Sequence, residues 1–263
     1  EQVALTIAAR HAAIQRAVTP LPGSVPRENY KSINVPRDCD GATMLDALGR
    51  VVKQVPQSYW ENECARGRIV DLERKPVAAT QTVRAGERYR HLFPNVTEPD
   101  VNGRVQILHE DEALIVVNKP APLPMHAGGR FYRNTLKHIL GIVYHPQRPH
   151  PAHRLDANTT GIVLVTRTQH FAGRLQPQFA RGTVEKRYLV RVQGHPAQDF
   201  FRCDAPISGE AGELGSRTVD EVSGQAACTE FRLVERSADG TALMEARPLT
   251  GRTNQIRIHL WHL

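Results

Sequence analysis

The chain of 263 residues lacks the patterns that mark several common classes of protein. Its four cysteines lie 25 or more residues apart without a CxxC pair, so neither a thiolate zinc site nor a disulfide framework is indicated. We find no run of about 18 apolar residues that would cross a membrane. Repeats and low-complexity tracts are also missing. With 40% hydrophobic and 23% charged residues, the composition is that of a globular protein.

Several enzyme signatures are missing as well. The sequence has no G-x4-GK[ST] phosphate loop, no HExxH and no GxSxG, so nucleotide hydrolases, zincins and serine hydrolases lack their residues. One arrangement suggests a metal, the H-x4-H-x2-H spacing of His145, His150 and His153. Because the prolines between these histidines favour a loop, we expect no metal site there.

Basic residues outnumber acidic ones, and they are unevenly distributed. Lys and Arg exceed Asp and Glu by 34 to 27, a net charge of +7. Residues 130–191 carry eleven basic and two acidic side chains, whereas residues 38–98 carry nine of each. A surface with this excess would concentrate polyphosphate ligands. A solvated face without a partner is the alternative.

The order of apolar and turn residues predicts an α+β fold in three regions. Residues 1–37 should be an N-terminal extension or linker, with a short helix followed by an irregular proline-rich stretch. Residues 38–98 should form a small α/β domain of two helices and a hairpin. In residues 99–263 strand patterns dominate, which predicts a mixed, mainly antiparallel sheet with flanking helices.

More detailed expectations follow from local patterns. In the small domain they are helices at 42–52 and 58–67 and strands at 68–72 and 82–89. In the larger region they are strands at 105–108, 113–118, 162–166, 184–193, 226–234 and 241–248 and helices at 135–140, 168–180 and 254–263, with Asn134 and Thr253 as caps.

The segment HRLDANTTG at 153–161 is the most unusual feature of the sequence. Its Asp156 is the only acidic residue between Glu112 and Glu185. Neighbouring arginines would keep this carboxylate ionised, whereas burial would raise its pKa. From spacing alone Asp156 is either a structural counter-ion, the more common case, or a nucleophile and base.

Three further stretches, VNKPAPLPMH at 117–126, EKRY at 185–188 and TGRTNQIRIH at 250–259, complete a set with HRLDANTTG. In this order the four blocks resemble the motifs of the RluA-type pseudouridine synthases, and the resemblance covers residues 101–263. The stretch GRFYRNT at 129–135 is similar to that of a subgroup whose eukaryotic members act on transfer RNA. Residues 39–92 resemble, in degenerate form, a ribosomal-protein-like RNA-binding domain.

The resemblance implies an isomerase that acts on uridines of ribosomal or transfer RNA without metal or organic cofactor. Uracil is detached from its ribose and rejoined through carbon 5. Asp156 matches the essential carboxylate, which attacks the anomeric carbon or removes a sugar proton. Arg257 matches its ion-pair partner, and Tyr188 matches a tyrosine that stacks on the target base and takes the proton from carbon 5. The ordinary alternatives are a helix surface charge for Arg257 and a half-buried strand residue for Tyr188.

The remaining expected site residues would bind RNA. Arg154 matches an arginine that fills the position left by a flipped nucleotide, and His153 should support the same loop. The others would contact phosphates; these are Lys119, Lys186, Arg252 and Arg130.

The sequence also departs from the family pattern. Asn254 stands where His is usual, Thr160 where Ser is usual and Pro122 where Gly is usual. The sequence stops at Leu263, six residues past Arg257, where family members continue, so we expect a catalytic domain truncated at its C-terminus. Two other functions stay open, a non-catalytic RNA-binding module and an RNA N-glycosidase, which would need a second carboxylate. We expect a cytoplasmic monomer without membrane association or an obligatory protein partner.

Overall fold

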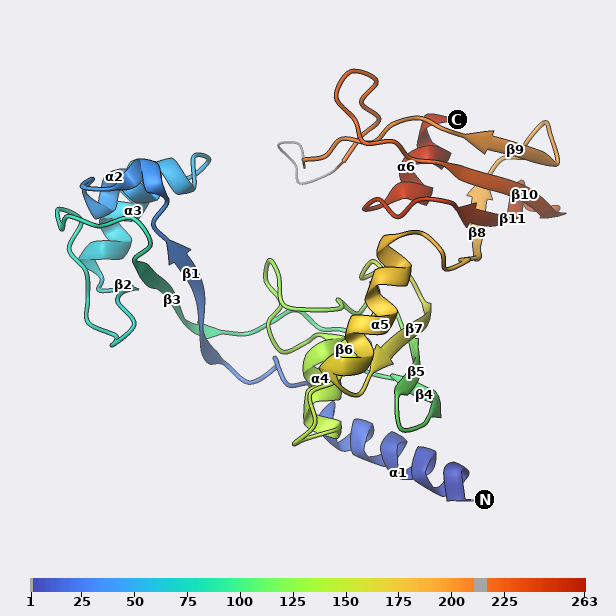
Figure 1. Cartoon of the computed structure of the whole chain (residues 1–263), viewed down its shortest axis with the longest axis horizontal. Coiled ribbons are helices and arrows are strands. Elements are labelled where there is room, and N and C mark those ends of the chain that lie inside the picture. The colour runs from blue at the N-terminus through green and yellow to red at the C-terminus, as the bar shows by residue number, and fades with distance from the viewer. Residues whose placement is uncertain (1, 211–216) are drawn as a thin grey trace. The chain divides into compact units, whose positions relative to one another are not determined.

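The structure, a computed structural model, describes residues 2–210 and 217–263 (Figure 1). The chain forms two compact units. The first comprises Glu1–Ala17, Asn102–Met125 and Leu136–Leu263, and the second comprises Val18–Val101 and His126–Thr135. This division differs from the expected one, since the first helix groups with the larger unit and residues 18–37, 99–101 and 126–135 group with the smaller one.

The second unit is a three-stranded antiparallel sheet with two helices. Its elements are β1 (Arg27–Asn34), the short 3-10 helix η1 (Arg37–Cys39), α2 (Met44–Val51), α3 (Gln57–Ala65), β2 (Ile69–Val70) and β3 (Arg88–Val96), with the strands in the order β1-β3-β2. The two helices were predicted. The expectation that residues up to 37 are irregular was wrong, because β1 pairs along β3. The second predicted strand also lies too early, since β3 begins at Arg88.

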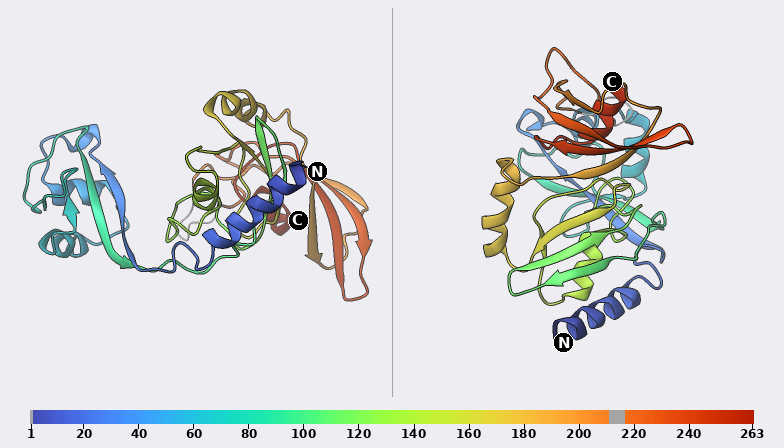
Figure 2. Two further views of the ribbon diagram at one scale, coloured as in Figure 1. Left: turned by 90° about the horizontal axis from the view of Figure 1, so that it is seen from below. Right: turned by 90° about the vertical axis from the view of Figure 1, so that its right-hand side faces the viewer.

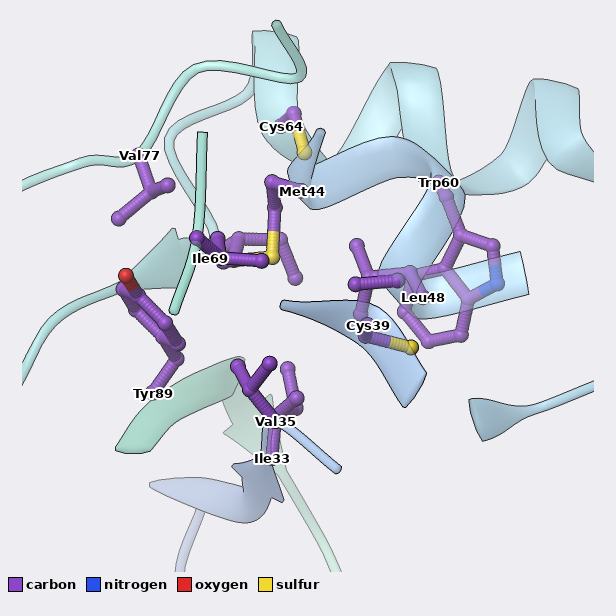
Figure 3. Packing of buried hydrophobic residues seen from close by; sticks show 12 residues of the cluster. Ile33, Val35, Cys39, Met44, Leu48, Trp60, Cys64, Ile69, Val77 and Tyr89 are labelled. Carbon is purple, nitrogen blue, oxygen red and sulfur yellow. The ribbon is translucent and has the colours of Figure 1, made fainter. Parts of the chain in front are cut away.

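One face of this sheet packs on the helices and forms the core of the second unit. Ile33 and Val35 contribute from β1 and the residues after it, and Tyr89 contributes from β3. They pack with Met44 and Leu48 of α2 and with a set of other buried side chains (Figure 3). Alternation along a strand sends every second side chain to this core, so the residues between them lie on the opposite face.

A four-stranded antiparallel sheet lies in the first unit. Its elements are β4 (Gln106–Glu110), β5 (Leu114–Lys119), β6 (His150–Pro151) and β7 (Gly161–Thr166), in the order β4-β5-β7-β6, with α1 (Gln2–Ala17), α4 (Leu136–Val143) and α5 (Gln169–Ala180) (Figure 2). Buried Glu110 binds the Tyr144 hydroxyl at 2.6 Å and Arg10 of α1 at 3.2 Å, which fixes the first helix to β4. The expected β4–β5 hairpin and the strand β7 are confirmed, although β7 buries only one face and Ile162 is 51% exposed.

A second four-stranded antiparallel sheet completes the first unit. It consists of β8 (Tyr188–Gln193), β9 (Phe200–Cys203), β10 (Thr229–Arg236) and β11 (Thr241–Pro248), in the order β8-β11-β10-β9. Phe231 and Met244 are fully buried and pack with Ile256 and Leu260 of α6 (Gln255–His262). Among the described residues the strands pair only antiparallel, which confirms the predicted α+β class.

Two predicted helix caps are wrong. Asn254, not Thr253, precedes α6, and it has left-handed φ and ψ of 58° and 19° without a side-chain cap. Asn134 uses its side chain elsewhere, since it accepts the Gly23 N–H at 2.8 Å and donates to the Pro99 carbonyl at 2.9 Å. All four cysteines are buried and form no disulfide. Within residues 2–210 and 217–263, no helix has both the length and the hydropathy to span a bilayer.

Candidate active site

Asp156 lies in the loop between β6 and β7, and backbone contacts fix that loop. The Thr159 N–H donates to the Asp156 carbonyl at 3.1 Å, and the Leu123 N–H donates to the Ala157 carbonyl at 2.9 Å. Leu155 is buried, whereas the Asp156 side chain keeps 25% of its surface exposed. The loop therefore presents its carboxylate to solvent from an ordered backbone.

Arg257 of α6 contacts that carboxylate directly. Its Nη2 lies 2.7 Å from Asp156 Oδ2 and 2.6 Å from Asn254 Oδ1, so one nitrogen joins two acceptors. The two partners are 101 residues apart in sequence. A charge-assisted hydrogen bond of this kind orients the carboxylate.

The backbone before Arg257 is held by an amide that the motif analysis did not assign to the site. Gln255 is buried; its Oε1 accepts from the Thr250 hydroxyl at 2.7 Å and from the Arg252 N–H at 2.9 Å, while its Nε2 donates to the Cys228 carbonyl at 2.8 Å. Asn254 was noticed only as a departure from the family pattern. Asn254 has a left-handed backbone and its side chain accepts from Arg257, so it helps to position that guanidinium.

Tyr188 begins β8 and is partly buried. Burial, and next the negative charge of Asp156, raise the pKa of its phenol. The expected proton transfer needs a positive neighbour, but the charge that acts on this phenol is negative. The environment of Tyr188 therefore supports stacking on a base and opposes ionisation at neutral pH.

Lys119, expected to contact phosphates, is fully buried at 0% exposure. The structure contradicts that expectation. Its Nζ donates to the carbonyls of Pro120, Leu123 and Ala157 at 2.9, 2.8 and 3.1 Å. Burial lowers its pKa to about 8, and the Asp156 charge opposes that shift. The buried ammonium group of Lys119 thus stabilises the backbone of the Asp156 loop.

Of the other expected RNA-binding residues, some are bonded to neighbouring groups of the protein and others are exposed to solvent. The His153 ring stacks on Phe179 at 4.3 Å, and its Nε2 accepts the Leu164 N–H at 3.1 Å, so it supports the loop and is not free for RNA. Burial lowers its pKa to about 4. Lys186 Nζ donates to the Thr250 carbonyl at 3.2 Å, and burial lowers its pKa.

Arg154, Arg252 and Arg130 are exposed. Arg252 donates from Nε to the Ala226 carbonyl at 3.0 Å, which leaves the outer part of its guanidinium for a ligand. Arg130 belongs to the second unit, whereas the other candidates belong to the first.

Comparison with known proteins bears on this arrangement. A family model described as RNA pseudouridylate synthase matches residues 113–262, more than half of the sequence. The chain belongs to the RNA pseudouridylate synthase family. The matched range contains the motif segments of Asp156, Tyr188 and Arg257, so the match confirms the resemblance that the four motifs indicated.

Individual family members are similar over most of the chain. The human pseudouridylate synthase RPUSD2 is 32% identical over 224 residues, which is 85% of this chain and 41% of that protein. Ribosomal large subunit pseudouridine synthase D of Nitrosomonas europaea is 32% identical over 252 residues, 90% of this chain and 70% of that protein. The chain thus spans less than half the length of the human relative.

A solved structure has the same fold as part of this RNA pseudouridylate synthase family member. Human RNA pseudouridylate synthase domain containing 1 aligns with a TM-score of 0.51 at 24% identity, over 59% of this chain and 63% of the human chain.

In the part of the chain that the structure describes, no group of three or more His, Cys, Asp or Glu could hold a metal ion, so the three histidines near 150 are not assembled into such a site.

Proposed function

We propose that the chain is an RNA pseudouridine synthase that isomerises specific uridines. The observation that carries the proposal is the 2.7 Å contact between Asp156 and Arg257, which joins two of the four motifs around one carboxylate. Family membership and the charge of Asp156 acting on Tyr188 support it. The roles of these three residues are part of the proposal.

The proposed reaction needs one ionised carboxylate and is redox-neutral. By one route Asp156 bonds to the anomeric carbon while the bond to uracil N1 breaks and uracil leaves with the electron pair. By the other route Asp156 removes a sugar proton while the bond to uracil N1 breaks, and a glycal forms. In both, uracil turns and its carbon 5 bonds to the anomeric carbon. This step displaces the Asp156 carboxylate in the first route and returns the proton from Asp156 to the sugar in the second. The carbon 5 proton is then lost and N1 takes up a proton. The Arg257 guanidinium orients the carboxylate throughout.

RNA must present the uridine outside its helical stack. Flipping a base costs a few kcal/mol, least for one already unpaired. Tyr188 provides the stacking surface for the flipped base, and exposed Arg154 fills the position that it leaves. Arg252 contacts the backbone.

We further infer that the substrate is ribosomal RNA, because the Nitrosomonas relative carries that substrate in its name. Transfer RNA remains the alternative that GRFYRNT suggests. A cytoplasmic location and action as a monomer belong to the same proposal.

Carbodiimide mapping tests the proposal. Bulk ribosomal and transfer RNA is incubated with the wild type or with Asp156→Ala, treated with carbodiimide, and read by reverse transcription. New stops at uridines that depend on Asp156 are expected. RNA binding without stops would instead identify a non-catalytic module, and release of free uracil would identify an N-glycosidase.

A further inference from the structure

The second unit has a sheet face opposite its core. On β1 the alternation places Tyr30, Ser32 and Asn34 on this face, and their partners in the β3 register are Leu92, Arg90 and Arg88. Tyr30 is 48% exposed, and Ser32, Asn34 and Arg88 are exposed as well. Ile33 and Tyr89 between them point into the core (Figure 3). We call Tyr30, Ser32, Asn34, Arg88 and Arg90 the outer strand face.

This face combines an exposed aromatic ring with unpaired positive charge. The Arg90 guanidinium lies 4.9 Å from the centre of the Tyr30 ring. Within the described residues, no carboxylate lies within 4 Å of Arg88 or Arg90. The acidic residue of β1, Glu28, is already paired with Arg74 at 2.7 Å.

The loop 126–135 is attached beside this face. The buried Glu98 carboxylate accepts three consecutive backbone N–H groups, those of Tyr132, Arg133 and Asn134, at 2.8 to 2.9 Å. The Tyr132 hydroxyl then donates to the Tyr30 carbonyl at 3.1 Å. Arg130 therefore lies exposed on a loop anchored to β1.

The net charge of the second unit, as the structure defines it, differs from that of residues 38–98. Residues 38–98 are neutral, but the second unit also contains β1 and the loop 126–135, and it carries fourteen Lys and Arg against eleven Asp and Glu. The added positive charge lies in the segments that border the outer strand face. The second unit therefore carries a net positive charge, unlike residues 38–98 alone.

We propose that the outer strand face, with Arg130, binds a single-stranded segment of RNA flanking the modified uridine. One base stacks on Tyr30, and phosphates contact Arg88, Arg90 and Arg130. An exposed aromatic ring among guanidinium groups is the combination that single-stranded nucleic acid requires, and it tolerates any base. The proposal deepens the proposed function and rests on it for the identity of the partner.

Fluorescence anisotropy with a labelled, mixed-sequence RNA of about 20 nucleotides tests this inference on the full chain. Arg88→Gln/Arg90→Gln should weaken binding about tenfold and reduce the slope of log affinity against log salt by about 1.4, because each single-strand phosphate contact contributes about 0.7. Tyr30→Ala should weaken binding about tenfold without changing the slope, since stacking is uncharged. Tyr30→Phe should bind like the wild type.

Arg50→Gln/Lys53→Gln is the matched control. It removes the same charge from exposed positions at the end of α2 and should leave affinity and slope unchanged. If this control loses affinity and the strand-face variants do not, the inference is wrong and the helical side binds RNA. Equal displacement of the RNA by polyglutamate would also overturn it, because the face would then be a general anion site. Circular dichroism verifies that each variant is folded.

The same variants separate this inference from the proposed function. Pseudouridine formation that depends on Asp156, with strand-face variants unchanged in affinity and slope, refutes the inference alone. Without any pseudouridine formation the proposed function fails, whereas loss of binding in Tyr30→Ala and Arg88→Gln/Arg90→Gln still supports the RNA surface. In active protein, these variants should raise KM about tenfold and leave kcat unchanged.

Discussion

Replacement of Lys119 by Met tests whether a buried ammonium group supports the Asp156 loop. Met fills a similar volume, but the carbonyls of Pro120 and Leu123 lose their ammonium donor. A buried polar group left unpaired costs about 1–3 kcal/mol. The Ala157 carbonyl keeps its second donor, the Leu123 N–H. With two carbonyls left unpaired, we expect the free energy of unfolding at pH 7 to fall by about 2–6 kcal/mol.

The pH dependence gives this prediction its specific signature. Burial lowers the pKa of Lys119 from 10.5 to about 8. Between these values the unfolded chain binds a proton that the folded chain has lost, so stability rises with pH in that window. Relative to Lys119→Met, the wild type should gain up to about 3 kcal/mol between pH 8 and 10.5. Groups that titrate in both proteins cancel from the difference.

Urea unfolding of both proteins at several pH values measures this difference. A wild-type advantage that stays constant from pH 8 to 10.5 would refute the reasoning, because the ammonium group would then not feel the burial that the structure shows. Loss of RNA modification at an unchanged affinity for RNA would further link Lys119 to the loop.

Three other predictions concern separate residues. Arg257→Ala should lower kcat at least tenfold but change the free energy of unfolding by less than about 1 kcal/mol, because the Arg257 side chain is 61% exposed. A stable variant with full activity would contradict this. His153, whose pKa falls to about 4, is neutral in the folded chain but takes up a proton near pH 6.5 when unfolded, so wild-type stability should fall by about 1–3 kcal/mol from pH 6.5 to 4. The free energy of unfolding of His153→Gln should depend less steeply on pH in this range than that of the wild type. Equal slopes for the two proteins would contradict the prediction. Glu98→Ala leaves three N–H groups of the loop 126–135 without their acceptor, and hydrogen exchange there should accelerate, whereas exchange in β7 should not.

Sequence patterns predicted the elements whose periodicity is strong and local. The β4–β5 hairpin and the strand β7 are examples, because apolar runs bounded by turns determine them. β1 was missed because it is short of apolar residues, with only Ile33 and the polar Asn29 buried. Its pairing with β3 depends on contacts about sixty residues away in sequence, which no local pattern reports.

The candidate site shows the same limit. The motifs indicated Asp156 and Arg257, and the structure brings them into contact. They could not show that the motif lysine, Lys119, faces inward, since a lysine in a sequence is read as exposed unless its carbonyl partners are known. Gln255 was passed over for the same reason, because its role depends on Cys228 and Thr250 from other elements.

The central claim is that Asp156 performs the isomerisation. Nucleoside chromatography of digested ribosomal RNA after single-turnover incubation measures pseudouridine directly. We predict conversion of uridine to pseudouridine by the wild type, none above background by Asp156→Asn, and equal RNA affinity for the two proteins. Pseudouridine formed by Asp156→Asn at the wild-type rate would contradict the account.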